Sequence, residues 1–138
     1  MPPIHKESGF SSPEAAEAAF YAAFANCNVQ AMDMVWANAE VVCIHPGSMA
    51  LLGREAVMRS WTNILSQAEP PKLDIEVVSR TESDGLAIHV VEEHITPQTG
   101  SPEPTSVVLA TNIYRLETSG WRLLEHHAST PRPRKTPH

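Results

Sequence analysis

Three polar residues of this chain stand in apolar surroundings where their side chains could transfer protons. His45 ends a short apolar run, Glu93 lies within an apolar stretch, and Asn112 interrupts a strand-like segment. An imidazole titrates near neutrality, burial raises the pKa of a carboxyl group, and a buried amide must find hydrogen-bond partners. The pattern predicts a base at His45, an acid at Glu93 and a hydrogen-bond donor at Asn112. The alternatives are a backbone-bonded imidazole, a carboxylate facing solvent or a second subunit, and an amide bonded to a neighbouring strand.

Aromatic residues surround the predicted position of His45. Trp36 and Trp61 belong to helical patterns on either side of the run that ends in His45, and Phe20 and Tyr21 belong to the first helical pattern. Such an arrangement predicts one wall of a pocket for a small, largely apolar molecule. Trp residues at helical spacing are more often core residues, and in a fold with a pocket they can serve both purposes.

Two pairs of adjacent residues must divide between the faces of the sheet, because neighbouring strand residues point to opposite sides. Only one of Glu92 and Glu93 can face a cavity, and alternation of apolar residues leaves that choice open. For His126 and His127, alternation counted from Trp121 places His127 on the same side as that Trp. His127 is therefore the expected ligand-contacting residue.

Metal binding is not expected. His45, Glu93 and His127 could converge in space, but the sequence contains no short ligand spacing such as His-Glu-x-x-His. A Ser-His-Asp arrangement also lacks support, because no Gly-x-Ser-x-Gly turn is present. We therefore expect neither a metal nor another cofactor.

Composition limits the class of protein. The 138 residues, 42% hydrophobic and 19% charged, are typical of one globular domain. The net charge of -6 argues against nucleic acid as a partner, which requires a basic face. No signal peptide or membrane-length apolar run is evident, and two cysteines make no disulfide framework, so we expect a cytoplasmic protein. We expect a flexible segment at 1–11, one domain at 12–130 and a disordered Pro- and Arg-containing tail at 131–138.

Periodicity predicts an α+β domain in which three helices precede most of the sheet. Ser12 is a plausible N-cap for the first helix, and Pro70-Pro71 ends the third. From there alternating residues and turn signals predict four successive antiparallel strands. The expected order is ααβαββββ, with helices at 13–26, 29–38 and 54–67 and strands at 40–44, 73–80, 86–96, 106–117 and 121–129.

This order and four motifs resemble the NTF2-like superfamily, over about residues 12–129. The motifs are Leu-Gly-Arg-Glu at 52–55, Cys-Ile-His-Pro-Gly at 43–47, Ala-Thr-Asn-Ile-Tyr-Arg at 110–115, and Gly-Trp-Arg at 120–122 leading to His-His-Ala-Ser at 126–129. They are similar to SnoaL-like and ketosteroid-isomerase-like members, and to the association domain of calcium/calmodulin-dependent kinase II. The resemblance implies a cystatin-like cone, in which the helices pack on a strongly curved, mainly antiparallel sheet. It also implies a deep pocket and a homodimer formed through the sheet.

The resemblance also suggests residue roles. In ketosteroid isomerases a general-base Asp follows the first strand before a Pro, and His45 occupies that place. A protonated Asp of the oxyanion hole corresponds to Asn112, and its partner Tyr corresponds to Phe20, with Tyr21 one residue away. All three positions differ, which argues against steroid isomerisation by that mechanism. The resemblance favours Glu93 as the inward carboxylate, and it leaves two functions open: acid–base chemistry on a bound small molecule, or a non-catalytic association module.

Overall fold

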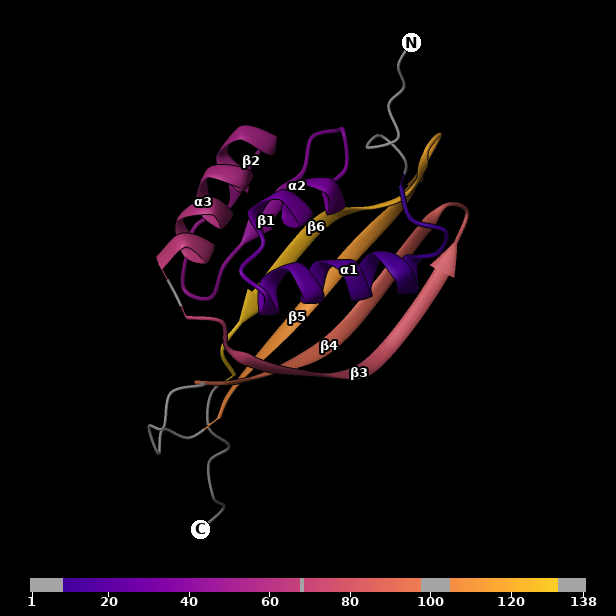
Figure 1. Cartoon of the computed structure of the whole chain (residues 1–138). Helices are drawn as coiled ribbons and strands as arrows, with labels where there is room; N and C mark the ends of the chain where they lie inside the picture. Colours follow the sequence, from indigo (N-terminus) through magenta and orange to yellow (C-terminus); the bar gives the residue numbers. More distant parts are fainter. Residues whose placement is uncertain (1–8, 68, 98–104, 132–138) are drawn as a thin grey trace.

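Within residues 9–67, 69–97 and 105–131, which the computed structural model describes, three helices lie on one face of a single curved sheet (Figure 1). All but the first residue of the predicted tail at 131–138, and most of the predicted N-terminal segment at 1–11, lie outside these residues. The elements in chain order are α1 (Pro13–Ala25), α2 (Val29–Val35), β1 (Val42–Ile44), β2 (Leu51–Leu52), α3 (Arg54–Gln67), β3 (Lys72–Ser83), β4 (Leu86–Thr96), β5 (Ser106–Glu117) and β6 (Gly120–Ser129).

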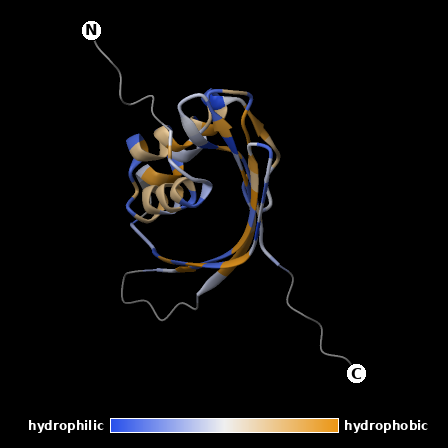
Figure 2. Cartoon of the chain, turned by 90° about the vertical axis from the view of Figure 1, so that its right-hand side faces the viewer, coloured by the Kyte–Doolittle hydropathy of each residue, from blue (hydrophilic) through white to orange (hydrophobic). Residues whose placement is uncertain are grey.

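The spatial order of the strands is β2-β1-β6-β5-β4-β3. Strands β3 to β6 form the predicted antiparallel meander, whereas β1 pairs with β6 in parallel. The long strands twist and curl around the helices (Figure 2). The predicted α+β order is confirmed, and the two-residue strand β2, which pairs with β1, is an addition that the sequence did not predict.

Helix starts follow the capping signals of the sequence. The Ser12 side chain accepts a hydrogen bond from the backbone N–H of Ala15 at 3.0 Å, and the Asn28 side chain does the same for Ala31 at 3.0 Å. Each cap satisfies a backbone donor that the first turn of a helix leaves unpaired. α2 ends earlier than predicted, at Val35, because Trp36 adopts extended backbone angles.

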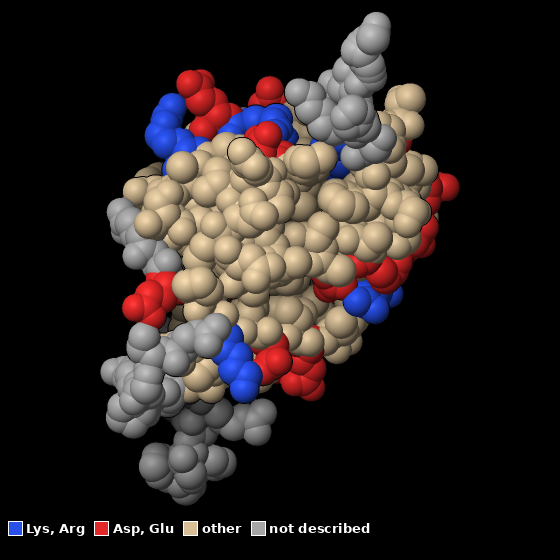
Figure 3. Space-filling model, in the orientation of Figure 1, with Lys and Arg blue, Asp and Glu red and all other residues tan. Residues whose placement is uncertain are grey.

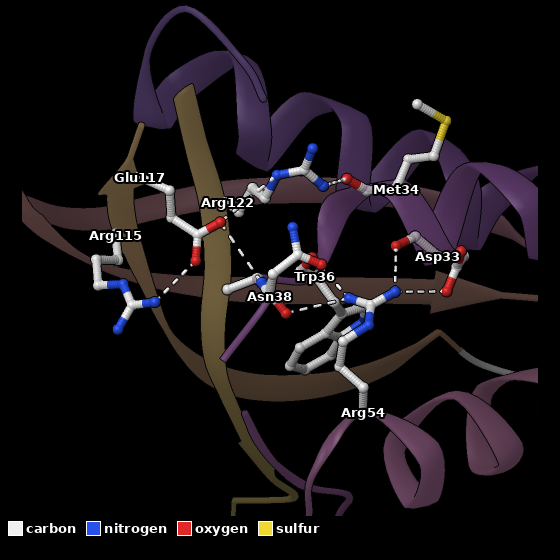
Figure 4. A network of polar contacts seen from close by, with 9 residues as sticks. Asp33, Met34, Trp36, Asn38, Arg54, Arg115, Glu117 and Arg122 are labelled. Carbon is white, nitrogen blue, oxygen red and sulfur yellow. Dashed lines mark hydrogen bonds and ion pairs between the residues drawn. The ribbon is translucent and has the colours of Figure 1, made fainter. Parts of the chain in front are cut away.

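Two arginines hold the end of the short helix α2 against the rest of the fold (Figure 4). The Arg54 guanidinium donates to the backbone carbonyls of Trp36 (2.8 Å), Ala37 (3.1 Å) and Asp33 (3.0 Å), and to the Asp33 carboxylate (2.6 Å). Arg122, on β6, donates to the carbonyl of Met34 at 2.7 Å. Carbonyls at a helix end have no partner within the helix, so these arginines satisfy acceptors that would otherwise be unpaired.

Replacing Arg54 by Ala should lower the free energy of unfolding by about 2–3 kcal/mol, because it strips donors from carbonyls of fully buried residues. Denaturant titration followed by Trp fluorescence measures this effect. The control is Arg59→Ala, which removes an exposed pair with Glu55 and should cost less than about 0.5 kcal/mol. Equal losses in both variants would contradict the assigned role of Arg54.

The helix-bearing face of the molecule is largely uncharged at its centre. Figure 3 shows that Lys, Arg, Asp and Glu lie mainly around the edge of this face. No helix of the described part of the chain has the length and apolar character needed to cross a membrane.

Candidate functional site

Four polar side chains from four different elements form a continuous hydrogen-bonded chain inside the fold. The Tyr21 hydroxyl, on α1, donates to Glu93 Oε2, on β4, at 2.6 Å. Asn112 Nδ2, on β5, donates to the Tyr21 hydroxyl at 2.8 Å, and His126 Nδ1, on β6, lies 2.5 Å from Asn112 Oδ1. At most 6% of the surface of any of these residues is exposed, so the chain lies between α1 and the concave face of the sheet.

The direction of each hydrogen bond in this chain is determined by its neighbours. Since the Asn112 amide nitrogen donates to Tyr21, its oxygen must be the acceptor, and His126 must carry a proton on Nδ1. The donors therefore run from His126 through Asn112 and Tyr21 to the Glu93 carboxylate. His126 Nε2 is then left as an acceptor in the neutral imidazole.

Burial gives Glu93 an unusual acidity. It raises the pKa of the carboxyl group to about 7, although the hydrogen bond from Tyr21 acts in the opposite direction. Burial and the nearby Glu93 carboxylate also raise the pKa of Tyr21, which therefore keeps its proton. A carboxyl group that titrates near neutrality can both accept and donate a proton under physiological conditions. Such perturbed groups gather at functional sites, although buried structural networks also produce them.

His126, and not His127, faces the interior. His126 is 2% exposed, whereas His127 is exposed on the opposite face, so the prediction for His127 is wrong. The reason is a β-bulge: Ile113 pairs with Glu125 but Tyr114 pairs with Leu123, which leaves one residue of β6 unpaired. An extra residue reverses the alternation beyond it. Burial, with a smaller effect of the neighbouring imidazoles, lowers the pKa of His126 to about 3, so this ring stays neutral.

His45 follows β1 and lies beside the polar chain without being bonded to it. Its Nε2 lies 2.9 Å from Ser60 Oγ, on α3, and its ring centre lies 5.1 Å from Trp61 and 6.5 Å from His126. Burial lowers the pKa of His45 below its usual 6.5, so the ring is neutral at pH 7. The neighbouring Cys43 thiol has its pKa raised to about 12 by burial and is no nucleophile near neutrality.

The aromatic residues predicted to line the pocket are mostly core residues. Phe20 and Trp36 are fully buried and Trp61 is 1% exposed. The Phe20 ring meets Trp61 edge-on with ring centres 5.5 Å apart, and meets Trp36 at 6.4 Å. Phe20, Trp36 and Trp61 are therefore core residues in this conformation, and their contact with a ligand stays a prediction.

Two surface hollows approach the polar chain from opposite sides. An open depression of about 1080 Å³ is lined by His45 and Ser60, and continues over Met49, Leu51 and Met58. A smaller hollow of about 190 Å³ between α1 and β3 reaches Tyr21. His45 and Tyr21 line these hollows and neighbour His126 and Glu93, respectively, whereas Glu93 and His126 line neither hollow.

The structure thus brings together Glu93, Asn112 and Tyr21, places His45 nearby, and adds His126. His127 lies on the opposite face of the sheet, so it cannot bind the same metal ion or small molecule as His45 and Glu93. The bond between Tyr21 and Glu93 joins residues 72 positions apart. Two features of the sequence could have indicated the roles of Tyr21 and His126: a polar Tyr within an apolar helix, and a His-His pair within a strand.

Comparison with known proteins agrees with this architecture. The sequence matches the SnoaL-like domain family over residues 14–133. The chain belongs to the SnoaL-like domain family. No curated protein matches the sequence.

Solved structures of other members and relatives are similar to this SnoaL-like protein. A protein from Thiobacillus denitrificans, provisionally named a calcium/calmodulin-dependent protein kinase type II association domain, is 39% identical. The match covers 91% of this chain and 100% of that one, with a TM-score of 0.84. A protein of the NTF2-like family from Streptomyces avermitilis, provisionally named a dehydratase, is 29% identical, with coverage of 86% and 92% and a TM-score of 0.77.

A ketosteroid isomerase-like protein from Erwinia carotovora atroseptica shares the fold at lower identity. It is 18% identical, with a TM-score of 0.70 over 87% of this chain and 94% of that chain. The resemblance to the NTF2-like superfamily is therefore confirmed at the level of family and fold.

Proposed function

We propose that this SnoaL-like protein binds a small, largely apolar molecule beside Glu93 and transfers a proton to or from it. The observation that carries the proposal is the buried donor chain that ends on Glu93, whose pKa is about 7. A structural carboxylate gains nothing from such a position, since burial penalises its charged form. A proton-transferring group needs a pKa near the working pH.

The residues take distinct roles in the proposed reaction. Glu93 exchanges the proton, and Tyr21 positions the carboxylate and is in turn positioned by Asn112. The Asn112 amide is fully buried, and its oxygen and one of its N–H groups are bonded within the chain, so we assign Asn112 the role of a positioning residue. Neutral His45, at the open depression, is available as a hydrogen-bonding partner or second base. The reaction class is isomerisation, cyclisation or dehydration, and the provisional name of the Streptomyces relative supports the last of these.

Native mass spectrometry of the freshly purified full chain tests the binding step. We expect a bound species lighter than about 1 kDa, because the open depression at His45 is about the size of a small-molecule pocket. The bound mass should survive in Glu93→Gln and be reduced in His45→Ala. Glu69→Ala, at an exposed position outside the site, is the matched control. A bound mass retained equally in all variants, or no retention of any compound from a panel of apolar carbonyl compounds, would contradict the proposal.

An association function has its own support, from the 39% identity to the Thiobacillus protein and from apolar residues on the outer face of the sheet. Leu86, Ile88 and Leu109 are 43%, 41% and 36% exposed there, and Ile88 pairs with Ile113 across β4 and β5. Exposed apolar side chains of this kind are typical of protein interfaces. We propose that two copies of the chain associate through this face.

Ile88→Lys should convert such a dimer to monomers, because a buried unpaired charge at an interface is costly. Light scattering coupled to size-exclusion chromatography measures the mass, and Leu52→Lys, at an exposed apolar residue of β2, is the control. A wild-type monomer, or a dimer that Ile88→Lys leaves intact, would rule out association through this face.

A further inference from the structure

Outside the proposed site, the outer face of the sheet carries a group of side chains with the composition of a metal site. Glu76 on β3 and Glu92 and His94 on β4 offer one ligand atom each, and these three atoms lie within 4.8 Å of one another. We call them the Glu76–Glu92–His94 cluster. Since residues of even number on β4 up to His94 face outward, this cluster is separated from Glu93 by the sheet itself.

The strand register explains why these groups meet. Glu76 lies directly opposite Glu92, and Asp74 lies directly opposite His94, so four potential ligands occupy neighbouring positions on two paired strands. A sheet fixes such positions more firmly than a loop does, which favours a preorganised site. A hollow of about 350 Å³ borders Asp74, Glu76 and His94 and gives access from solvent.

The distances suit a small divalent cation. His94 Nε2 lies 3.0 Å from Glu92 Oε1 and 3.6 Å from Glu76 Oε1. Ligand atoms around a tetrahedral zinc ion, each about 2.0–2.1 Å from the metal, are separated from one another by about 3.3–3.4 Å. The two observed distances bracket that value, and the two carboxylate oxygens lie within 4.8 Å of each other.

The negative charges of the two glutamates favour the binding of a cation. Directly opposed carboxylates on neighbouring strands repel each other, and Glu76 and Glu92 are such a pair. Within the part of the chain that the structure describes, neither Asp74, Glu76 nor Glu92 forms an ion pair with a Lys or Arg. One imidazole with two or three carboxylates is a donor set for zinc and similar transition metals, whereas calcium and magnesium prefer oxygen ligands alone.

We propose that the Glu76–Glu92–His94 cluster binds one divalent transition metal ion, with zinc as the expected occupant. Water from the bordering hollow supplies the remaining coordination. Such an ion would join β3 to β4 and stabilise the folded chain by mass action.

Calorimetric titration of Zn²⁺ into the chelator-treated full chain at pH 7 tests this proposal. We expect one ion per chain, with binding weakened at least about tenfold by His94→Gln or by Glu76→Gln with Glu92→Gln, since each change removes ligands. His127→Gln is the matched control, because His127 is an exposed imidazole on the same face. The control should bind as the wild type does.

A second readout separates loss of ligands from loss of folding. Co²⁺ bound in place of Zn²⁺ should give visible absorption bands in the wild type that vanish in the His94→Gln variant while its circular dichroism spectrum is unchanged. Absence of saturable binding below millimolar Zn²⁺, or equal binding by the wild type and the ligand variants, would overturn the proposal. A simple ion pair of His94 with the two glutamates would give either of these results.

Discussion

Glu93→Gln should raise the free energy of unfolding by about 2–3 kcal/mol at pH 8. The Glu93 carboxyl has a pKa of about 7 in the folded protein, against an ordinary value of 4.5. Between these values the folded state holds the proton more tightly than the unfolded state does, so stability falls as pH rises through this window. The accumulated cost above pH 7 is about 3 kcal/mol, at 1.36 kcal/mol per pKa unit. Gln keeps an acceptor for Tyr21 and removes the buried charge.

Urea unfolding of both proteins across pH 4.5–8 measures this difference. The stability advantage of Glu93→Gln should shrink as pH falls and disappear near the ordinary pKa of a carboxyl group, about 4.5. Glu82→Gln, at an exposed position of β3, is the control and should change stability by less than about 0.5 kcal/mol at every pH. A Gln variant that is less stable than the wild type at pH 8 would show that Glu93 is a structural carboxylate.

His126 should make the protein sensitive to acid. The pKa of its buried imidazole is about 3 in the folded protein, against an ordinary value of 6.5. As pH falls below 6.5 the unfolded state takes up a proton that the folded state does not, so stability is lost through the window from 6.5 to 3. The total loss is about 4–5 kcal/mol, again at 1.36 kcal/mol per unit. In the upper part of this window Glu93 acts in the opposite direction and partly offsets the loss.

His126→Asn isolates this effect, because an Asn amide can still donate to Asn112 while it cannot titrate. We expect the variant to be less stable than the wild type at pH 7, where it lacks the packing of a buried ring, and to lose less stability on acidification. His127→Asn, which changes the exposed neighbour, should follow the wild type at all pH values. If the free energy of unfolding fell in parallel for the wild type and His126→Asn between pH 6.5 and 4, this would contradict the conclusion that His126 is a buried, neutral imidazole.

The sequence was sufficient for most of the fold, because the signals that define it are local. Ser12 caps the first helix through a contact three residues away, and alternating residues and turn signals mark the strands of the meander. Strand β2 could not be predicted, since two residues carry no periodicity and their pairing with β1 depends on the loop between them.

The site was only partly predictable, because its contacts join distant parts of the chain. Glu93 and Asn112 could be chosen as polar residues in apolar strands, but nothing local shows that Tyr21 bonds to both. The tryptophans illustrate the opposite difficulty. Composition alone cannot distinguish a ring that lines a cavity from one that fills it, and Trp36 is fully buried.

The bulge in β6 determines which residues in the second half of that strand face the interior of the protein. Leu124 is the residue that the pairing skips, and because it is skipped, His126 and not His127 shares the inner face with Leu123. A related sequence that lacks the bulged residue would keep the equivalent of His126 inward, because its alternation continues unbroken from Leu123. A sequence of the same length without the bulge would instead present the equivalent of His127 to its interior. Alignments within the family should therefore place insertions and deletions at this position before they assign equivalent histidines.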